Sequence, residues 1–450
     1  MTIVLTVPSQ SGRAARTLAA GLALFAVVAA ASGQSMFRGD PAHRGIVDSH
    51  GPVALKGVKW TFKTEGAVVS SPVLAGGIVY FGSDDCSLYA VDQASGALQW
   101  KFSTSAKDVP GGPVRSTPAV AEGAVYFGSY DGNFYALDAA TGALKWKFAM
   151  PGERKFTAPG LHSYLPRQQP IPDFWDLYQS SPVVAGGLVY FGCGDGAIYA
   201  LETATGALKW KVQTGDVVHS SPALADGVLY VGSWDTFLYA LDAGTGDVKW
   251  KFKTGEDRAN FNQTGIQSSA SVVDGTVYFG CRDFHLYAVD AKTGQEKWKY
   301  KNTWVIASPV VRDGRVYGTT SIPPVFFVLD AATGQELLKT DVKAPAFSSL
   351  ALAGPLAYFG TFGGSLYAVN VADGSVAWLF QTPAAKANAN GYLKADGSLD
   401  FAKLFTAQYF EDMYAAGGKL FSLGAIVSSP AVAQGVVIFG SADGNVYALE

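Results

Sequence analysis

The chain repeats one pattern of hydrophobic and polar positions about every 40 residues. In the unit SSPVVAGGLVYFGCGDGAIYALETATGALKWKV (Ser180–Val212), four short runs rich in β-branched and aromatic residues are separated by Gly, Asp and Thr. Such runs predict four β-strands joined by tight turns. Equivalent units begin at Ser70, Ser116, Ser180, Ser220, Ser268, Ala307, Ser348 and Ser428. Four-stranded units of this length predict the blades of a β-propeller.

The last unit lacks its fourth strand. It begins at Ser428 and reaches Glu450 with the third strand, whereas the missing pattern stands at the other end of the chain, in GVKWTFKT (Gly57–Thr64). We therefore expect an all-β, eight-bladed propeller over residues 57–450, with four-stranded blades and the last blade closed by the N-terminal strand. A Trp recurs near the end of the units, for example Trp250, and we expect it to pack between neighbouring blades.

Residues 1–33 predict a secretory signal peptide. Arg13 and Arg16 precede the apolar run Leu18–Ala30, and small residues follow that run. We expect residues 34–56 to form an N-terminal arm on the ring. The mature chain is then periplasmic or secreted, soluble after cleavage, and without an integral membrane segment.

Composition narrows the choice of partners. The net charge is −3 and no basic stripe occurs along the chain, so nucleic acid is not an expected partner. The three cysteines form no disulfide framework, and the five histidines show no metal-ligand spacing. Neither a G-x-S-x-G nor a P-loop motif occurs. We expect no catalytic set and no metal site, and we expect a monomer.

The spacing A-x-D-x-x-x-G-x-x-x-W, for example Ala240, Asp242, Gly246 and Trp250, resembles the tryptophan-docking motif of the pyrroloquinoline-quinone (PQQ) repeat family. The match extends in eight copies over residues 57–450. The resemblance implies a propeller and leaves two functions open. One branch is the BamB type, a non-enzymatic scaffold for outer-membrane protein assembly. The other is the quinoprotein alcohol dehydrogenases, which bind PQQ and Ca²⁺ on the propeller axis.

The long insertions all fall on one face of the expected ring, because strand direction alternates within each blade. The two largest are residues 150–179, before the third blade, and 381–427, before the eighth. The second contains apolar positions at helical spacing, which predict one helix over Leu399–Ala416, ended by Gly417 and Gly418. This helix either packs on the propeller or serves as a lid or partner-docking element. Binding usually occurs at such variable loops on a rigid ring.

The residue before each blade start is expected to line the channel mouth on this variable-loop face. Four consecutive blades place polar side chains there: Arg115, Gln179, His219 and Gln267. The other four blades place apolar ones. A mouth that is half polar and half apolar suits an amphipathic small molecule or a peptide. The alternative is that these side chains merely line a solvated channel.

The quinoprotein resemblance implies further candidate positions. Arg115 matches an arginine at the start of the second blade in those enzymes, and Arg282 matches another on a loop between the second and third strands. The run GSWD (Gly232–Asp235) stands where those enzymes have a G-T-G-N stretch. Asp235 could therefore bind Ca²⁺ only as a replacement for a residue of that stretch. The family's adjacent Cys pair is absent, and the turn CGDG (Cys193–Gly196) replaces a Ca²⁺-ligating loop. No clear counterpart of the catalytic-base segment precedes the fifth blade, where Asp257 and the run NFNQ (Asn260–Gln263) stand.

The sequence thus predicts an exported, non-enzymatic binding or scaffold propeller of the BamB type, with protein or peptide partners on the variable-loop face and no cofactor. No lipoprotein cysteine stands near the cleavage site, which departs from BamB. The alternative is a divergent alcohol or sugar dehydrogenase dependent on PQQ and Ca²⁺. The candidate cofactor-binding residues at the mouth are Arg115, Gln179, His219, Gln267, Arg282 and Asp235.

Overall fold

The structure is a computed structural model. It describes residues 34–105, 111–158, 164, 169–255, 264–301, 304–406, 408–409 and 411–450. Residues Ser32–Glu450 form one compact unit. The predicted signal peptide, residues 1–33, lies outside the described residues, as does Asp257. Within the described part of the chain, no helix is long and apolar enough to cross a membrane.

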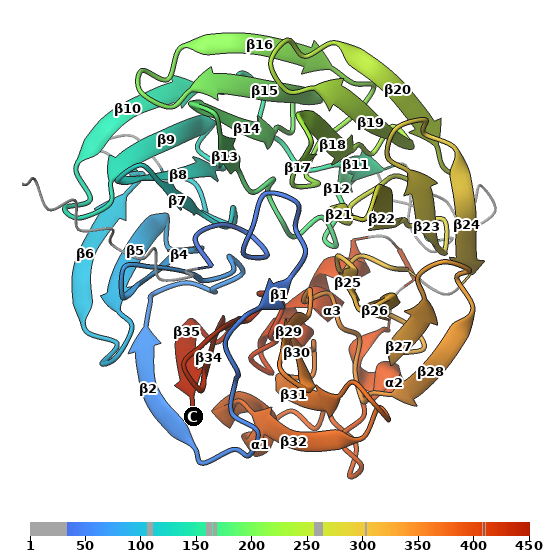
Figure 1. The fold of residues 1–450 in the computed structure, drawn as a ribbon. Coiled ribbons are helices and arrows are strands. Elements are labelled where there is room, and N and C mark those ends of the chain that lie inside the picture. Colours follow the sequence, from blue (N-terminus) through green and yellow to red (C-terminus); the bar gives the residue numbers. More distant parts are fainter. Residues whose placement is uncertain are drawn as a thin grey trace, which may run out of the picture. The chain divides into compact units, whose positions relative to one another are not determined.

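Eight four-stranded antiparallel blades form a ring (Figure 1). This arrangement confirms the expected all-β, eight-bladed propeller. Two small additions extend it: β1 (Ile46–Val47) pairs in parallel with the seventh blade, and β11 (Thr157–Ala158) pairs with β12 (Ile171–Pro172) inside the first long insertion. In the first seven blades, strands that follow one another along the chain lie side by side, so each of these blades is a simple meander.

The first blade consists of β3 (Val73–Ala75), β4 (Ile78–Ser83), β5 (Ser87–Asp92) and β6 (Leu98–Ser103), and the second of β7 (Ala119–Ala121), β8 (Ala124–Ser129), β9 (Asn133–Asp138) and β10 (Leu144–Ala149). The third blade consists of β13 (Val183–Ala185), β14 (Leu188–Gly192), β15 (Ala197–Glu202) and β16 (Leu208–Gln213), and the fourth of β17 (Ala223–Ala225), β18 (Val228–Gly232), β19 (Phe237–Asp242) and β20 (Val248–Lys253). The fifth blade consists of β21 (Ser271–Val273), β22 (Thr276–Gly280), β23 (His285–Asp290) and β24 (Glu296–Lys301), and the sixth of β25 (Val310–Arg312), β26 (Arg315–Thr319), β27 (Val325–Asp330) and β28 (Glu336–Asp341). The seventh blade consists of β29 (Ala351–Ala353), β30 (Leu356–Gly360), β31 (Ser365–Asn370) and β32 (Val376–Gln381), and the eighth of β33 (Ala431–Ala433), β34 (Val436–Gly440), β35 (Asn445–Leu449) and β2 (Val58–Lys63).

Strands from both ends of the chain build the eighth blade. β2 pairs antiparallel with β35, with Trp60 opposite Ala448 and Phe62 opposite Val446. The predicted closure by the N-terminal strand is therefore confirmed. Because the last blade is completed in this way, the ring has no gap at which an unpaired inner strand would be exposed.

The repeated Trp joins six of the blades to the next one. Trp210 lies opposite Ala200 in its own blade, and its Nε1 donates to the carbonyl of Ala243 in the next blade at 3.0 Å. Its ring rests against Gly246 of that blade, where a Cβ would lie 2.9 Å from the indole. The same hydrogen bond to the next blade recurs from Trp60, Trp100, Trp146, Trp250 and Trp298. The expected packing of Trp between blades is confirmed.

The arm, residues 34–56, closes one end of the channel. Its strand β1 lies near the centre of the ring (Figure 1). Backbone N–H groups of five innermost strands donate to arm carbonyls: Leu74 to Gln34, Val120 to Ser35, Leu224 to Pro41, Val272 to Ala42 and Leu352 to Gly45, at 2.6–3.0 Å. Innermost strands otherwise present unpaired edges, so the arm satisfies them as an added strand would.

A partly buried arginine and a buried histidine lie in the middle of the arm. The Arg38 guanidinium donates to the carbonyls of His43, Ser308 and Pro309 at 2.8, 2.7 and 2.7 Å. His43 is fully buried, and neither ring nitrogen has a hydrogen-bond partner in the described structure. Burial, together with the nearby Arg38 charge, lowers the pKa of His43 to about 3. The histidine is therefore neutral when folded at neutral pH.

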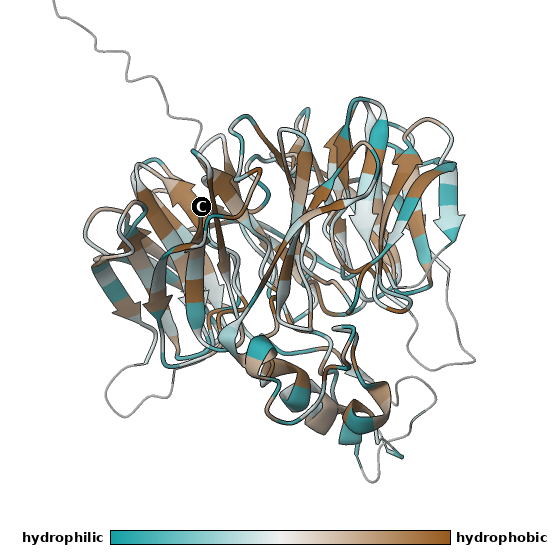
Figure 2. Cartoon of the chain, turned by 90° about the horizontal axis from the view of Figure 1, so that it is seen from below, coloured by the Kyte–Doolittle hydropathy of each residue, from teal (hydrophilic) through white to brown (hydrophobic). Residues whose placement is uncertain are grey.

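Three helices of the described chain lie in the 381–427 insertion: α1 (Pro383–Ala387), α2 (Phe401–Leu404) and α3 (Asp412–Phe421). Figure 2 shows them gathered on one face of the ring. Thr382 caps α1, because its side chain accepts from the backbone N–H of Ala385. The buried side of α3 includes Met413 and Leu420, which join a large aromatic cluster on this face.

The single helix expected over Leu399–Ala416 is wrong. Two helices replace it, and α3 continues through Gly417 and Gly418 to Phe421. The reason is close packing: a Cβ at Gly417 would lie 2.1 Å from the ring of Phe174. Gly417 therefore permits a contact between α3 and the other long insertion, and it does not end the helix.

Candidate functional site

A segment of the 150–179 insertion fills the channel mouth on the variable-loop face. This segment, Asp173–Tyr178, is called the plug. Asp173 and Asp176 are completely buried. The plug is tied at both ends, since the Asp173 N–H donates to the carbonyl of Phe156 at 2.7 Å and the Tyr178 hydroxyl donates to that of Val427 at 2.8 Å. The mouth is thus filled by the chain itself.

The four polar residues predicted for the mouth come together around the plug. Three of them bond it directly: His219 Nδ1 lies 2.7 Å from Asp176 Oδ1, Gln267 Nε2 donates to the Trp175 carbonyl at 2.6 Å, and Arg115 Nη1 donates to the Leu177 carbonyl at 3.4 Å. Gln179 follows the plug, and its Oε1 accepts from the backbone N–H of Arg115 at 3.3 Å. Arg115 also holds Asp84 through two hydrogen bonds of 2.8 and 2.7 Å.

His219 lies between two carboxylates. Its Nε2 is 3.1 Å from Glu153 Oε1, while its Nδ1 contacts Asp176. Burial disfavours a charged imidazole, but the two carboxylates outweigh burial and raise the pKa of His219 to about 10. The same partnership lowers the pKa of Asp176, against the opposing effect of its burial. His219 is therefore a cation at neutral pH, and it donates a hydrogen bond to each carboxylate.

Arg282 holds the start of the plug. It is fully buried, and its Nη1 lies 2.7 Å from Asp173 Oδ2. The guanidinium carbon lies 4.7 Å from the ring centre of Trp234 and 4.1 Å from that of Trp304. Two aromatic faces and one carboxylate thus stabilise a cation that has no access to water. Its Nε and Nη2 have no hydrogen-bond partner in the described structure.

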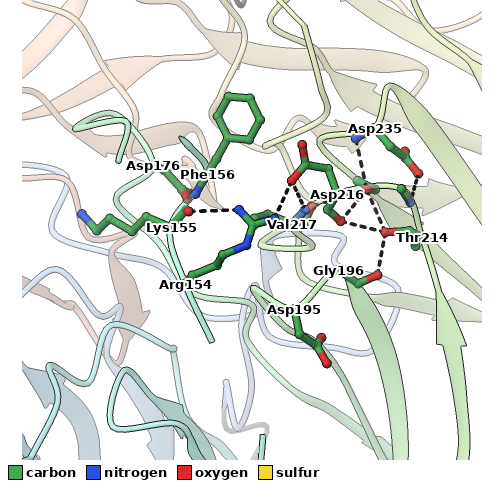
Figure 3. Close-up of polar contacts among 12 residues, drawn as sticks. Arg154, Lys155, Phe156, Asp176, Asp195, Gly196, Thr214, Asp216, Val217 and Asp235 are labelled. Carbon is green, nitrogen blue, oxygen red and sulfur yellow. Dashed lines mark hydrogen bonds and ion pairs between the residues drawn. The ribbon is translucent and has the colours of Figure 1, made fainter. Parts of the chain in front are cut away.

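Asp235 is not brought to the plug. Its Oδ2 accepts from the Tyr239 hydroxyl at 2.6 Å and from the Gly215 N–H at 2.7 Å, which fixes a turn between the second and third strands. Asp85, Asp131, Asp195, Asp283 and Asp443 make the same bond to a Tyr four residues on. Figure 3 shows Asp235 beside Asp216. The Asp216 carboxylate accepts a hydrogen bond from the Arg154 guanidinium. The Asp176 carboxylate instead accepts from the Phe156 N–H.

An apolar pocket of about 380 Å³ lies beside the plug on the same face. Its lining includes Trp175, Trp304, Phe347, Phe362, Phe405 and Leu420. Trp175 belongs to the plug, so one ring contributes both to the closed mouth and to the open pocket. No Asp, Glu, Lys or Arg occurs among the described residues that line this pocket.

Comparison with known proteins places this propeller in a family. The family model described as "Outer membrane protein assembly factor BamB" matches residues 53–160, 169–304 and 301–398, which is most of the chain. The chain belongs to this PQQ-repeat family. No curated protein sequence matches the chain. The resemblance inferred from the tryptophan-docking motif is thereby confirmed.

Solved structures similar to this PQQ-repeat protein include BamB and two dehydrogenases. BamB from Moraxella catarrhalis is 16% identical with a TM-score of 0.61, covering 88% of this chain and 97% of its own. A europium-containing methanol dehydrogenase is 15% identical with a TM-score of 0.67, covering 93% and 98%. The quinohemoprotein alcohol dehydrogenase from Comamonas testosteroni is 16% identical with a TM-score of 0.67, covering 94% and 81%. At these identities the likeness shows the fold alone.

The mouth of this PQQ-repeat propeller does not fit PQQ while the plug is in place. The cavity that Arg115, Gln179, His219 and Gln267 share is about 30 Å³. Pockets for small ligands are about 300–1,000 Å³. The groups that would receive the carboxylates of the quinone already bond carboxylates and carbonyls of the chain. In the described residues, no group of three or more His, Cys, Asp or Glu is placed to hold a metal ion.

Sequence reasoning did not identify the acidic partners of the mouth. It identified Arg115, His219 and Arg282, but not Asp173, Asp176 or Glu153. A usable signal exists in PDFWDLY, where two carboxylates stand in an otherwise apolar run just before a blade. Such carboxylates are buried only when they are paired, so the run predicts cations opposite it.

Proposed function

We propose that the protein is an exported, non-enzymatic scaffold that docks a protein or peptide partner on its variable-loop face. Two facts support this proposal. The family is described by an assembly factor of the outer membrane, and the described parts of the 150–179 and 381–427 insertions pack together on one face of the ring. Loops held by such a ring are suited to presenting a binding surface.

The plug is the observation that carries the proposal. His219, Gln267 and Arg282 each make one hydrogen bond to the plug, so the channel mouth already has an occupant. A cofactor would have to break the buried Arg282–Asp173 and His219–Asp176 pairs before it could bind. Leaving one member of a buried ion pair without its partner typically costs about 3–5 kcal/mol. The outer surface of the insertions is then the surface that remains for a partner.

The place of action is also proposed. The sequence of residues 1–33 predicts export, and the family is described by an outer-membrane assembly factor. We place the mature chain in the periplasm as a monomer. Cell fractionation combined with N-terminal sequencing of the mature chain tests this location, and an uncleaved cytosolic chain would contradict it.

Two titrations of the mature chain test the function. The first adds PQQ with Ca²⁺ and follows quinone absorbance and the melting temperature. The second adds a fluorescently labelled outer-membrane β-barrel polypeptide, unfolded in urea and then diluted, and follows anisotropy. We expect no saturable PQQ binding and saturable binding of the unfolded chain. PQQ binding that Arg115→Ala abolishes would instead support the dehydrogenase alternative, to be assayed with alcohols and sugars.

A further inference from the structure

The apolar pocket beside the plug has the character of an anchor site. It is lined mainly by aromatic and aliphatic side chains, and Ser321 is the one residue with a polar side chain, other than Tyr and Trp, among its described lining. We infer that this pocket receives a bulky apolar side chain from an uncharged segment of the partner protein. The inference rests on the proposed docking function and names the site and the chemistry of its partner.

The rim of the pocket is apolar and exposed. Ile322 is 52% exposed and Phe401 is 37% exposed, and both line the pocket. Six other exposed large hydrophobic residues occupy one repeated position of the outer strands and belong to the fold: Val58, Leu98, Leu144, Leu208, Val248 and Val376. Ile322 and Phe401 follow no such repeat. An apolar rim around an apolar pocket is typical of a protein-binding surface.

The exposed rim favours a peptide over a small hydrophobic ligand. A small ligand would fill the pocket and leave Ile322 and Phe401 in water. A peptide segment covers the rim and inserts one side chain, which is the usual arrangement of a central anchor within a protein interface. The described lining carries no charged side chain, which disfavours a charged segment, because a charge buried there would have no partner among these residues.

Synthetic nonapeptides with blocked ends test the inference. One peptide carries two Phe residues among Gly and Ser, and the other carries Lys and Glu at the same positions. We expect saturable binding of the Phe peptide alone, measured by calorimetry. Ile322→Glu and Phe401→Glu each place a charge on the apolar rim, and each should weaken binding about tenfold or more. Leu208→Glu, at 50% exposure on β16, is the matched control and should change nothing.

The outcomes separate this inference from the proposed function. If the unfolded β-barrel chain binds but ignores both pocket substitutions, the scaffold function stands and the pocket inference is overturned. Preferential binding of the Lys and Glu peptide would overturn it as well. Tight binding of free indole that is unaffected by Ile322→Glu would make the pocket a small-molecule site. If neither peptides nor the unfolded chain bind, the scaffold function itself fails. Melting temperatures of the variants confirm that each is folded.

Discussion

The two ends of the propeller channel are both closed by the chain itself, but through different chemistry. At one end, the arm accepts hydrogen bonds from backbone N–H groups of the innermost strands. At the other end, side chains of opposite charge hold the plug, as in the Arg282–Asp173 and His219–Asp176 pairs. The arm is held largely by backbone geometry, and the plug by the identity of particular side chains.

The two closures therefore depend to different degrees on the identity of the residues that form them. Backbone pairing at a strand edge needs no particular residue, so it reflects the ring itself. Buried ion pairs are costly unless both partners are present. The plug end therefore carries the specific feature of this chain, and it is the end beside the apolar pocket. Substitutions at the two ends should have effects of different size and different pH dependence.

The largest effect is expected from Arg282→Ala. It leaves Asp173 buried without a cation, so we expect a loss of about 3–5 kcal/mol in the free energy of unfolding. Arg154→Ala removes a half-exposed partner of Asp216 and should cost about 0–1 kcal/mol. Urea denaturation monitored by fluorescence measures both. Equal costs for the two variants would contradict the account of the plug.

A smaller effect is expected at the arm. Arg38→Ala removes a donor to three buried carbonyls, and we expect a loss of about 2–3 kcal/mol. Hydrogen exchange locates the effect: the amides of Leu74 and Val120, which pair with the arm, should exchange faster, while the amide of Phe156 at the plug stays protected. Faster exchange at Phe156 would mean that the two ends are not independent.

The two ends should respond to pH in opposite directions. In the folded chain the pKa of His43 is lowered to about 3, whereas in the unfolded chain it is about 6.5. Between these two pH values the unfolded chain binds a proton that the folded chain does not. The free energy of unfolding therefore falls as the pH drops from 6.5 towards 3. The loss from this group at pH 5 is about 2 kcal/mol. His219 has a raised pKa, so its contribution is present below about 6.5 and is lost as pH rises towards 10.

Variants isolate these two histidines from the other titrating groups. His43→Gln should remove part of the acid sensitivity, and His219→Gln should remove part of the alkaline sensitivity. Melting temperatures from pH 4 to pH 10 measure both. The same pH profile in each variant and in the unaltered chain would contradict the assignment.

The smallest effects are expected in α3. Gly417→Ala places a Cβ against the ring of Phe174 and should cost about 1–3 kcal/mol through overpacking. Gly418→Ala meets nothing within 4 Å and should stabilise the helix by about 0.5–1 kcal/mol. Thermal unfolding of the two variants should therefore shift in opposite directions, and a shift of the same sign in both would be inconsistent with the Gly417–Phe174 contact.

The repeat made the ring predictable from sequence. Period, turn residues and the Trp of each unit are local signals, and the missing last strand could be matched to Gly57–Thr64 by its own pattern. The cationic side of the mouth was also accessible, because Arg115 and His219 occupy a fixed place in the repeat. Each of these inferences used a position that the other blades define.

The insertions were not predictable in the same way, because they have no repeat to define positions. Their structure depends on contacts distant in sequence, such as Phe174 against Gly417 and Asp173 against Arg282. Local signals misled at Gly417, where a glycine that permits close approach was interpreted as a helix end. Asp235 shows a related difficulty: its sequence context does not distinguish a turn residue from a ligand.

The most direct test of the central claim is hydrogen exchange in the plug of the full mature chain, with and without excess PQQ and Ca²⁺. The account predicts that the amides of Phe156, Asp173 and Asp176 stay protected and unchanged, because the plug remains the occupant of the mouth. A change in their protection that saturates with PQQ, and that Arg115→Ala abolishes, would show that the plug yields to a cofactor and would contradict the account.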